Sequence, residues 1–172
     1  MIQARSGPLI KVKNMGYDLE TQGKKWVIGV PIKTSNARFQ EEAPLLWQRF
    51  YSEGLAEKIP NRIDQNLIVV YTDYEGDYTQ PFTYLMGCSV SNLNTIPQGM
   101  RGIEIAESPY AVFTAHGPFP EAMVQTWHAI WESHILRSYT TDFEVYPPDF
   151  DQQNTPEIKI YIALKSIPQR NP

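Results

Sequence analysis

Apolar residues recur along the chain with two periods, and these periods predict where its strands and helices lie. Alternating apolar and polar positions, or short apolar runs between turn-forming residues, are typical of strands. By this criterion we expect strands at Leu9–Lys13, Trp26–Lys33, Asn66–Tyr74, Phe82–Val90, Arg101–Ala106, Tyr110–Ala115, Asp142–Tyr146 and Glu157–Leu164. Several of these segments are separated by glycine, proline, asparagine or acidic residues, which favour turns.

Two other segments have the spacing of amphipathic helices. The first follows the acidic pair Glu41–Glu42, and Pro44 is expected as its first helical residue because proline is well tolerated there. This helix should end near Gly54–Glu57. The second helix is expected after Gly117–Pro120. Its apolar positions are Met123, Trp127, Ile130, Trp131 and Ile135.

The two helical segments reveal an internal repeat. At identical spacing, Trp47, Phe50, Tyr51 and Leu55 match Trp127, Ile130, Trp131 and Ile135. The same alignment pairs Tyr71 with Tyr146 and, with a slightly longer second hairpin loop, Tyr84 with Tyr161. Each half, at about 26–90 and 101–164, therefore predicts a strand–helix–strand–strand (βαββ) unit. We expect an α+β fold with a pseudo-twofold duplication, in which one antiparallel-dominated sheet carries both helices on one face.

Length and charge narrow the class of protein. The 172 residues are expected to form a single domain over 1–172, with a loose tail at 1–7. The net charge of -4, from 15 basic and 19 acidic residues, disfavours direct nucleic-acid binding, because such proteins usually present a basic face. No apolar run is long enough to span a membrane, and the first residues lack the apolar core of a signal peptide. We therefore expect a cytoplasmic protein without membrane association.

Cofactor and metal motifs are missing from the sequence. It contains no glycine-rich phosphate loop, nucleophile elbow or zinc-binding helix motif. His128 and Glu132 lie four residues apart, but no third ligand follows at a suitable spacing. The single cysteine, Cys88, excludes an intramolecular disulfide, and its apolar strand predicts a buried structural thiol. We expect neither a metal nor a cofactor.

Aromatic residues and one acid carry the candidate chemistry. Phe, Trp and Tyr make up 12% of the chain, and a pocket lined by rings suits flat, hydrophobic, often cationic ligands. The repeat aligns Glu144 with Val69, and strand alternation puts Glu144 on the same face as Asp142 and Tyr146. From this pattern alone, Glu144 is either a solvated surface acid or a carboxylate held among rings. In the second case a ligand or protein group must pair with it.

Several segments of the chain resemble the GyrI-like effector-binding domain. They are Val70–Glu75, Gly102–Ile105, Tyr110–Gly117, Trp131, Asp142–Tyr146 and Ile160–Leu164. Such domains sense small molecules in many AraC-type and MerR-type transcription activators, and they also occur free-standing, including on mobile gene cassettes. The regulators carry a helix-turn-helix region ahead of the domain, whereas residues 1–22 show no pattern for one. We therefore do not expect this chain alone to control transcription directly.

The resemblance implies a pair of βαββ units with a ligand pocket at their junction. In the multidrug-sensing members, a buried glutamate on the penultimate strand meets lipophilic cations among aromatic rings, and the matching residue here is Glu144. The resemblance also implies an aromatic wall of Trp131, Tyr110, Tyr146 and Tyr71. The expected partner is a small lipophilic cation, and a homodimer or a separate DNA-binding partner stays open.

Two other functions also stay open. Some free-standing members of the family hydrolyse cyclopropane-bearing alkylators, and the resemblance would then make Glu144 an acid or base assisted by Tyr110 or Tyr146. Inhibition of DNA gyrase is associated with the family's namesake, so the chain could instead be a protein-interaction or inhibitor module. Loss of turnover in Glu144→Gln would separate the hydrolase from a binding module.

Overall fold

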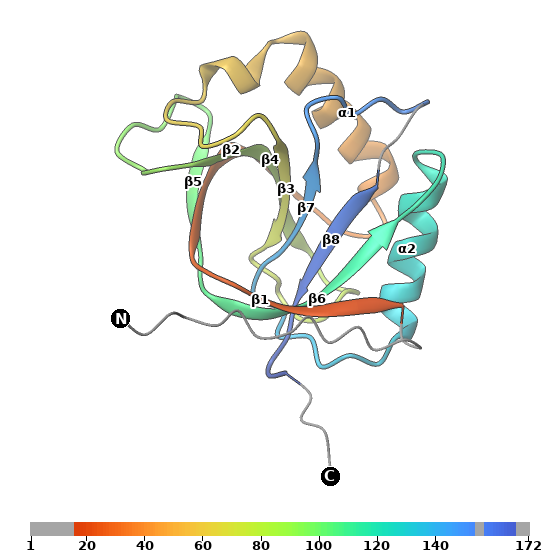
Figure 1. Cartoon of the computed structure of the whole chain (residues 1–172). Helices are drawn as coiled ribbons and strands as arrows, with labels where there is room; N and C mark the ends of the chain where they lie inside the picture. Colours follow the sequence, from red (N-terminus) through yellow and green to blue (C-terminus); the bar gives the residue numbers. More distant parts are fainter. Residues whose placement is uncertain (1–15, 154–156, 168–172) are drawn as a thin grey trace, which may run out of the picture.

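A computed structural model describes residues 16–153 and 157–167, and within them all strands join one antiparallel sheet (Figure 1). The sheet has eight strands in the order β1-β6-β8-β7-β3-β4-β2-β5. The strands are β1 Tyr17–Gln22, β2 Lys25–Thr34, β3 Leu67–Thr72, β4 Phe82–Val90, β5 Arg101–Ile105, β6 Ser108–Ala115, β7 Asp142–Tyr146 and β8 Ile158–Ala163. The helices are α1 Phe39–Ser52, the short 3-10 helix η1 Leu55–Lys58, and α2 Glu121–Glu132.

The strand order confirms the duplication that the repeat predicts. The two βαββ units are β2-α1-β3-β4 and β6-α2-β7-β8, and they meet where β3 pairs with β7 at the centre of the sheet. Each unit is preceded by one more strand, which pairs with the other unit: β1 with β6, and β5 with β2. The two halves therefore exchange their first strands, a feature that the sequence repeat does not predict.

Both helices lie on one face of the sheet, as expected, and the sheet curves away from them (Figure 1). A buried cluster between the sheet and the helices includes Leu46 of α1, Ile130 of α2 and Val69 of β3. A second cluster lies on the other face of the sheet and includes Val70 and Phe143. Because both faces are covered, β3 is buried at every position.

Several element boundaries differ from the predicted ones: Leu55 lies in η1 and Ile135 lies beyond α2, and two further differences concern α1 and β1. Helix α1 begins at Phe39, so Pro44 lies within the helix and removes one of its hydrogen bonds. Strand β1, at Tyr17–Gln22, was not predicted, because its residues are mostly polar. The predicted strand Leu9–Lys13 and the predicted tail at 1–7 lie outside the described residues.

Cys88 is the expected structural thiol. It lies on β4 with no exposed surface, and burial raises the pKa of its thiol to about 11. The thiol is thus protonated at neutral pH and poorly nucleophilic. Over residues 16–153 and 157–167, no helix is long and apolar enough to cross a membrane, and no group of three or more histidine, cysteine or acidic side chains could hold a metal ion.

Candidate ligand-binding site

Strand β7 holds Glu144 in the centre of the sheet, on the face that the helices cover. Glu144 lies opposite Val69 of β3 and Ile160 of β8, and only 1% of its surface is exposed. Its direction follows from strand alternation, because the adjacent Phe143 and Val145 belong to the cluster on the other face. Glu144 is therefore a buried carboxyl group and not a solvated surface acid.

Three ring donors surround the Glu144 carboxylate. The Tyr71 hydroxyl and the Trp127 Nε1 donate to Oε2, at 2.9 Å and 2.8 Å. The Tyr146 hydroxyl donates to Oε1 at 2.9 Å. In the part of the chain that the structure describes, no lysine, arginine or histidine forms an ion pair with Glu144. The carboxylate thus has neutral hydrogen-bond partners and no counter-charge from these residues.

Burial dominates the electrostatics of this group. It raises the pKa of Glu144, and the hydrogen bonds from Trp127, Tyr146 and Tyr71 offset that effect only in part. Burial, followed by the nearby Glu144 charge, also raises the pKa values of Tyr71 and Tyr146 well above their ordinary values. Both phenols therefore stay protonated at neutral pH and can donate to the Glu144 carboxyl group.

The repeat supplies equivalent tryptophans from the two helices. Trp47 of α1 donates to the Tyr84 hydroxyl at 2.8 Å, just as Trp127 of α2 donates to Glu144. Trp47 also packs edge-on against Tyr146, with ring centroids 4.8 Å apart, and Trp127 packs against Tyr71 at 4.9 Å. Each helix thus extends one indole over the central strands, and these rings enclose the carboxylate.

The structure brings some of the predicted site residues together and separates others. Tyr71 and Tyr146 contact Glu144, as described above. Trp131 lies one helical turn beyond Trp127, packs against it at a centroid distance of 6.3 Å, and stacks on Tyr78 at 5.8 Å. Trp131 therefore lies beside the ring cluster but contributes no hydrogen bond to Glu144 among the described contacts.

Tyr110 does not join this group. It is buried on the other face of the sheet, where it packs edge-on against Phe143 at 5.3 Å and against Tyr161. The alternation of β6 explains this, because Ala111 and Phe113 face the helices and Tyr110 points the other way. The expectation that Tyr110 belongs to the aromatic wall, or assists Glu144, is therefore corrected.

Sequence reasoning missed Trp127, Trp47 and Tyr84 as site residues. The helical spacing of the two tryptophans suggested ordinary packing positions. The repeat nevertheless contained the signal, because both halves carry tryptophan at the same place in the helix. An indole N–H that recurs at the same position of both helices, above the central strands, indicates that each strand pair provides an acceptor for its hydrogen bond.

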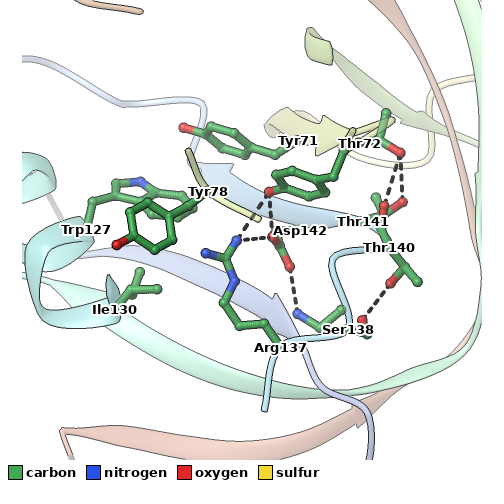
Figure 2. Close-up of polar contacts among 12 residues, drawn as sticks. Tyr71, Thr72, Tyr78, Trp127, Ile130, Arg137, Ser138, Thr140, Thr141 and Asp142 are labelled. Atoms are coloured by element: carbon green, nitrogen blue, oxygen red, sulfur yellow. Dashed lines mark hydrogen bonds and ion pairs between the residues drawn. The ribbon is translucent and has the colours of Figure 1, made fainter. Parts of the chain in front are cut away.

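Asp142, two residues before Glu144 on β7, forms a buried ion pair with Arg137 (Figure 2). Asp142 has no exposed surface, and Arg137, from the segment between α2 and β7, donates from Nη2 to its Oδ2 at 2.8 Å. The Tyr74 hydroxyl donates to the same oxygen at 2.6 Å, and the Ala163 backbone N–H donates to Oδ1 at 2.7 Å. Asp142 thus has the counter-charge that Glu144 lacks.

Comparison with known proteins assigns this arrangement to a family. Residues 18–164 match the family described as Cass2, integron-associated effector binding protein. The chain belongs to the Cass2 family. The resemblance to effector-binding domains is thereby confirmed, and binding of a small-molecule effector is the function that the family name describes.

Relatives of this Cass2 protein share most of its length. YobU of Bacillus subtilis (strain 168), which is named as a transcriptional regulator protein, is 29% identical over 144 residues, or 80% of this chain and 90% of YobU. An integron cassette protein from the mobile metagenome of Vibrio cholerae is 25% identical, with a TM-score of 0.70 over 87% of this chain and 96% of that one. SAV2435, solved with bound tetraphenylphosphonium, is 21% identical, with a TM-score of 0.70 over 88% and 94% of the two chains. This last likeness shows a shared fold.

Proposed function

We propose that this Cass2 protein binds lipophilic organic cations and that Glu144 provides their counter-charge. One observation carries the proposal: a carboxylate with 1% exposed surface has three neutral donors and no ion-pair partner among residues 16–153 and 157–167. An ionised carboxylate buried without a counter-charge is costly, and a bound cation would remove that cost. The tetraphenylphosphonium bound to SAV2435, a protein of the same fold, supports this class of ligand.

The rings around Glu144 suit such a ligand. Tyr71, Tyr146, Trp127 and Trp47 lie within the cluster, and a cation over an aromatic face gains roughly 0.5–2 kcal/mol, depending on desolvation. A neutral analogue would make the same apolar contacts but would leave the carboxylate without a counter-charge. The site should therefore select for positive charge as well as for flat, apolar shape.

A ligand reaches Glu144 only if one of the covering side chains moves. Tyr71 and Tyr146 are buried, with 7% and 2% of their surfaces exposed, and both come from central strands. Trp127 is only half-buried and comes from α2, which packs on the sheet from outside. Trp127 is therefore the donor expected to move aside, so its fluorescence should report binding.

The test is a titration with tetraphenylphosphonium, followed by tryptophan fluorescence. Glu144→Gln should weaken binding by at least about tenfold, which corresponds to about 1.4 kcal/mol. Neutral tetraphenylsilane, which has the same shape but no charge and no hydrogen-bond acceptor, should bind the wild type more weakly than the cation does, and its affinities for the two proteins should be similar. As a matched control, Glu41→Gln removes an exposed acid of α1 and should bind tetraphenylphosphonium like the wild type. Equally tight binding of the cation by Glu144→Gln would contradict the proposal.

A further inference from the structure

Arg137 carries hydrogen-bond donors that its ion pair does not use. Its side chain is 5% exposed, and its Nη2 donates to Asp142 Oδ2 at 2.8 Å and to the Tyr74 hydroxyl at 3.4 Å. Its Nε and Nη1 are also buried, but they have no hydrogen-bond partner among the described residues. Buried donors without an acceptor are unfavourable, and most native structures avoid them.

The ion pair itself cannot satisfy these two nitrogens. Asp142 Oδ2 already accepts from Arg137 and Tyr74, and Oδ1 accepts from the backbone of Ala163. The ring of Tyr139 lies 4.3 Å from the guanidinium carbon and covers its face. A ring over the face of a guanidinium leaves its N–H groups, which lie in the plane, without an acceptor.

One of the two unused donors, Nη1, points away from Asp142. Figure 2 shows one terminal nitrogen of Arg137 bonded to Asp142 and the other on the side of Tyr78. The charge of Arg137 also reaches the turn that carries Tyr78, since it contributes, after hydrogen bonds from Thr79, to the lowered pKa of Asp77. Tyr78 stacks on Trp131, and Trp131 packs against Trp127, which donates to Glu144, so one continuous group of rings connects Tyr78 with the carboxylate.

The spacing of Asp142 and Glu144 along β7 determines how far the buried ion pair lies from the Glu144 carboxylate. Asp142 and Glu144 are two residues apart on the same face of the strand, so their Cα atoms are separated by about 6.6 Å. A ligand of moderate size that places its positive charge at Glu144 can therefore bring a second group to Arg137.

The balance of charge indicates what that second group is. Arg137 and Asp142 neutralise each other, so the cluster has the single negative charge of Glu144, and a monovalent cation would balance it. A second, anionic group on the ligand would leave one negative charge uncompensated, whereas a carbonyl-type oxygen accepts a hydrogen bond without adding charge. We propose that the ligand is a lipophilic cation carrying an uncharged carbonyl-type oxygen, which accepts hydrogen bonds from Arg137. This inference rests on the proposed function of Glu144.

The experiment compares cations that differ only in this oxygen. The wild type is titrated with hexyltriphenylphosphonium and (5-oxohexyl)triphenylphosphonium, and with the pentyl and 4-oxopentyl compounds as a second pair. At least one ketone should bind about tenfold more tightly than its alkyl partner, as expected for a hydrogen bond to a charged donor. If neither ketone binds more tightly than its partner, the inference is overturned, and this comparison needs no variant.

Two double variants then assign the effect to Arg137. Arg137→Met with Asp142→Asn removes both members of the buried pair, which avoids leaving an isolated buried charge. The ratio of ketone to alkyl affinity should fall to about one. The matched control is Arg101→Met with Asp73→Asn, which removes an exposed arginine–aspartate pair and should retain the wild-type ratio. A ketone preference that persists without Arg137 would overturn the assignment.

The same titrations separate this inference from the proposed function. Suppose that the alkyl cations bind the wild type, that Glu144→Gln weakens this binding, and that the ketones bind no more tightly than the alkyl cations. Only the proposed role of Arg137 would then be wrong. If the alkyl cations do not bind, or bind Glu144→Gln equally well, the cation site fails and this inference fails with it.

Discussion

Trp47 and Trp127 occupy the same position in the two halves of the repeat, but their N–H groups meet different acceptors. Trp47 donates to the phenol of Tyr84, and Trp127 donates to the carboxylate of Glu144. An uncharged phenol can be buried with one hydrogen bond at little cost, whereas a carboxylate keeps an uncompensated charge. The two tryptophans have similar surroundings. The candidate site therefore lies in the second half because Trp127 meets a carboxylate there, whereas Trp47 meets a phenol.

The raised pKa of Glu144 predicts that this residue lowers stability as the pH rises. Its ordinary value is 4.5, and burial makes the folded value higher, so the folded state binds the proton more tightly than the unfolded state. The contribution of Glu144 to the free energy of unfolding is therefore fully present below the unfolded pKa and is lost as the pH rises through the folded pKa. A tenfold difference in proton affinity corresponds to about 1.4 kcal/mol.

Glu144→Gln removes this titration and isolates its effect. Urea unfolding of both proteins between about pH 4 and pH 8 should show the wild type losing stability relative to the variant as the pH rises. Both proteins contain the same other acids, so the contributions of those acids to the pH dependence of stability cancel in the comparison. One of them is Asp73, whose pKa is lowered by a hydrogen bond from Arg101 and whose contribution to stability therefore has the opposite pH dependence. A difference that does not change with pH would show that Glu144 has the same proton affinity in both states.

At the scale of elements, hydrophobic periodicity predicted both helices and the strands from Trp26 onward. It predicted the direction of the side chains only in strands where polar and apolar residues alternate. Strand β7 alternates acidic and apolar residues, so the sequence predicted that Glu144 shares a face with Asp142 and Tyr146, but it left open whether that face is exposed or buried. The apolar run of β6 is buried on both faces, and no polar side marks its orientation, so the direction of Tyr110 could not be predicted. For the same reason the match of Tyr84 with Tyr161 is wrong: Tyr84 faces the helices and Tyr161 the other face.

The close contact between β2 and β4 gives a prediction at this scale. Gly29 and Gly87 lie directly opposite each other, and a Cβ atom added to Gly87 would overlap the Ile28 carbonyl and lie 2.6 Å from the Gly29 Cα. These are backbone atoms, which cannot move aside without disturbing both strands. Gly87→Ala should therefore lower the free energy of unfolding by about 1–3 kcal/mol, measured by urea unfolding.

Gly23→Ala provides the matched control for this substitution. Gly23 lies between β1 and β2, and an added Cβ would meet no atom within 4 Å. Its replacement by alanine should leave stability within about 1 kcal/mol of the wild type. If Gly87→Ala were no more destabilising than Gly23→Ala, the close packing of β2 on β4 would not be a determinant of stability.

At the scale of the whole molecule, the candidate site lies where the two halves join. Tyr71 of the first half and Tyr146 and Trp127 of the second hold the same carboxylate, next to the central pairing of β3 with β7. A ligand at Glu144 would therefore contact both halves at once. The repeat could predict this junction, but not the exchange of β1 and β5 between the halves, because pairing between distant edges leaves no local signal in the sequence.

This location predicts that a bound cation stabilises both halves together. Tetraphenylphosphonium at 100 times its Kd should add about 2.7 kcal/mol to the free energy of unfolding, which raises the unfolding midpoint of a chain of this size by about 5–10 °C. Tryptophan fluorescence and far-UV circular dichroism should show the same increase, since the first reports the ring cluster and the second reports the entire sheet and both helices. At the same ligand concentration, a tenfold weaker Kd in Glu144→Gln should reduce the added stability to about half. An increase seen by fluorescence alone would instead mean that the ligand stabilises only its local surroundings and that the two halves unfold separately.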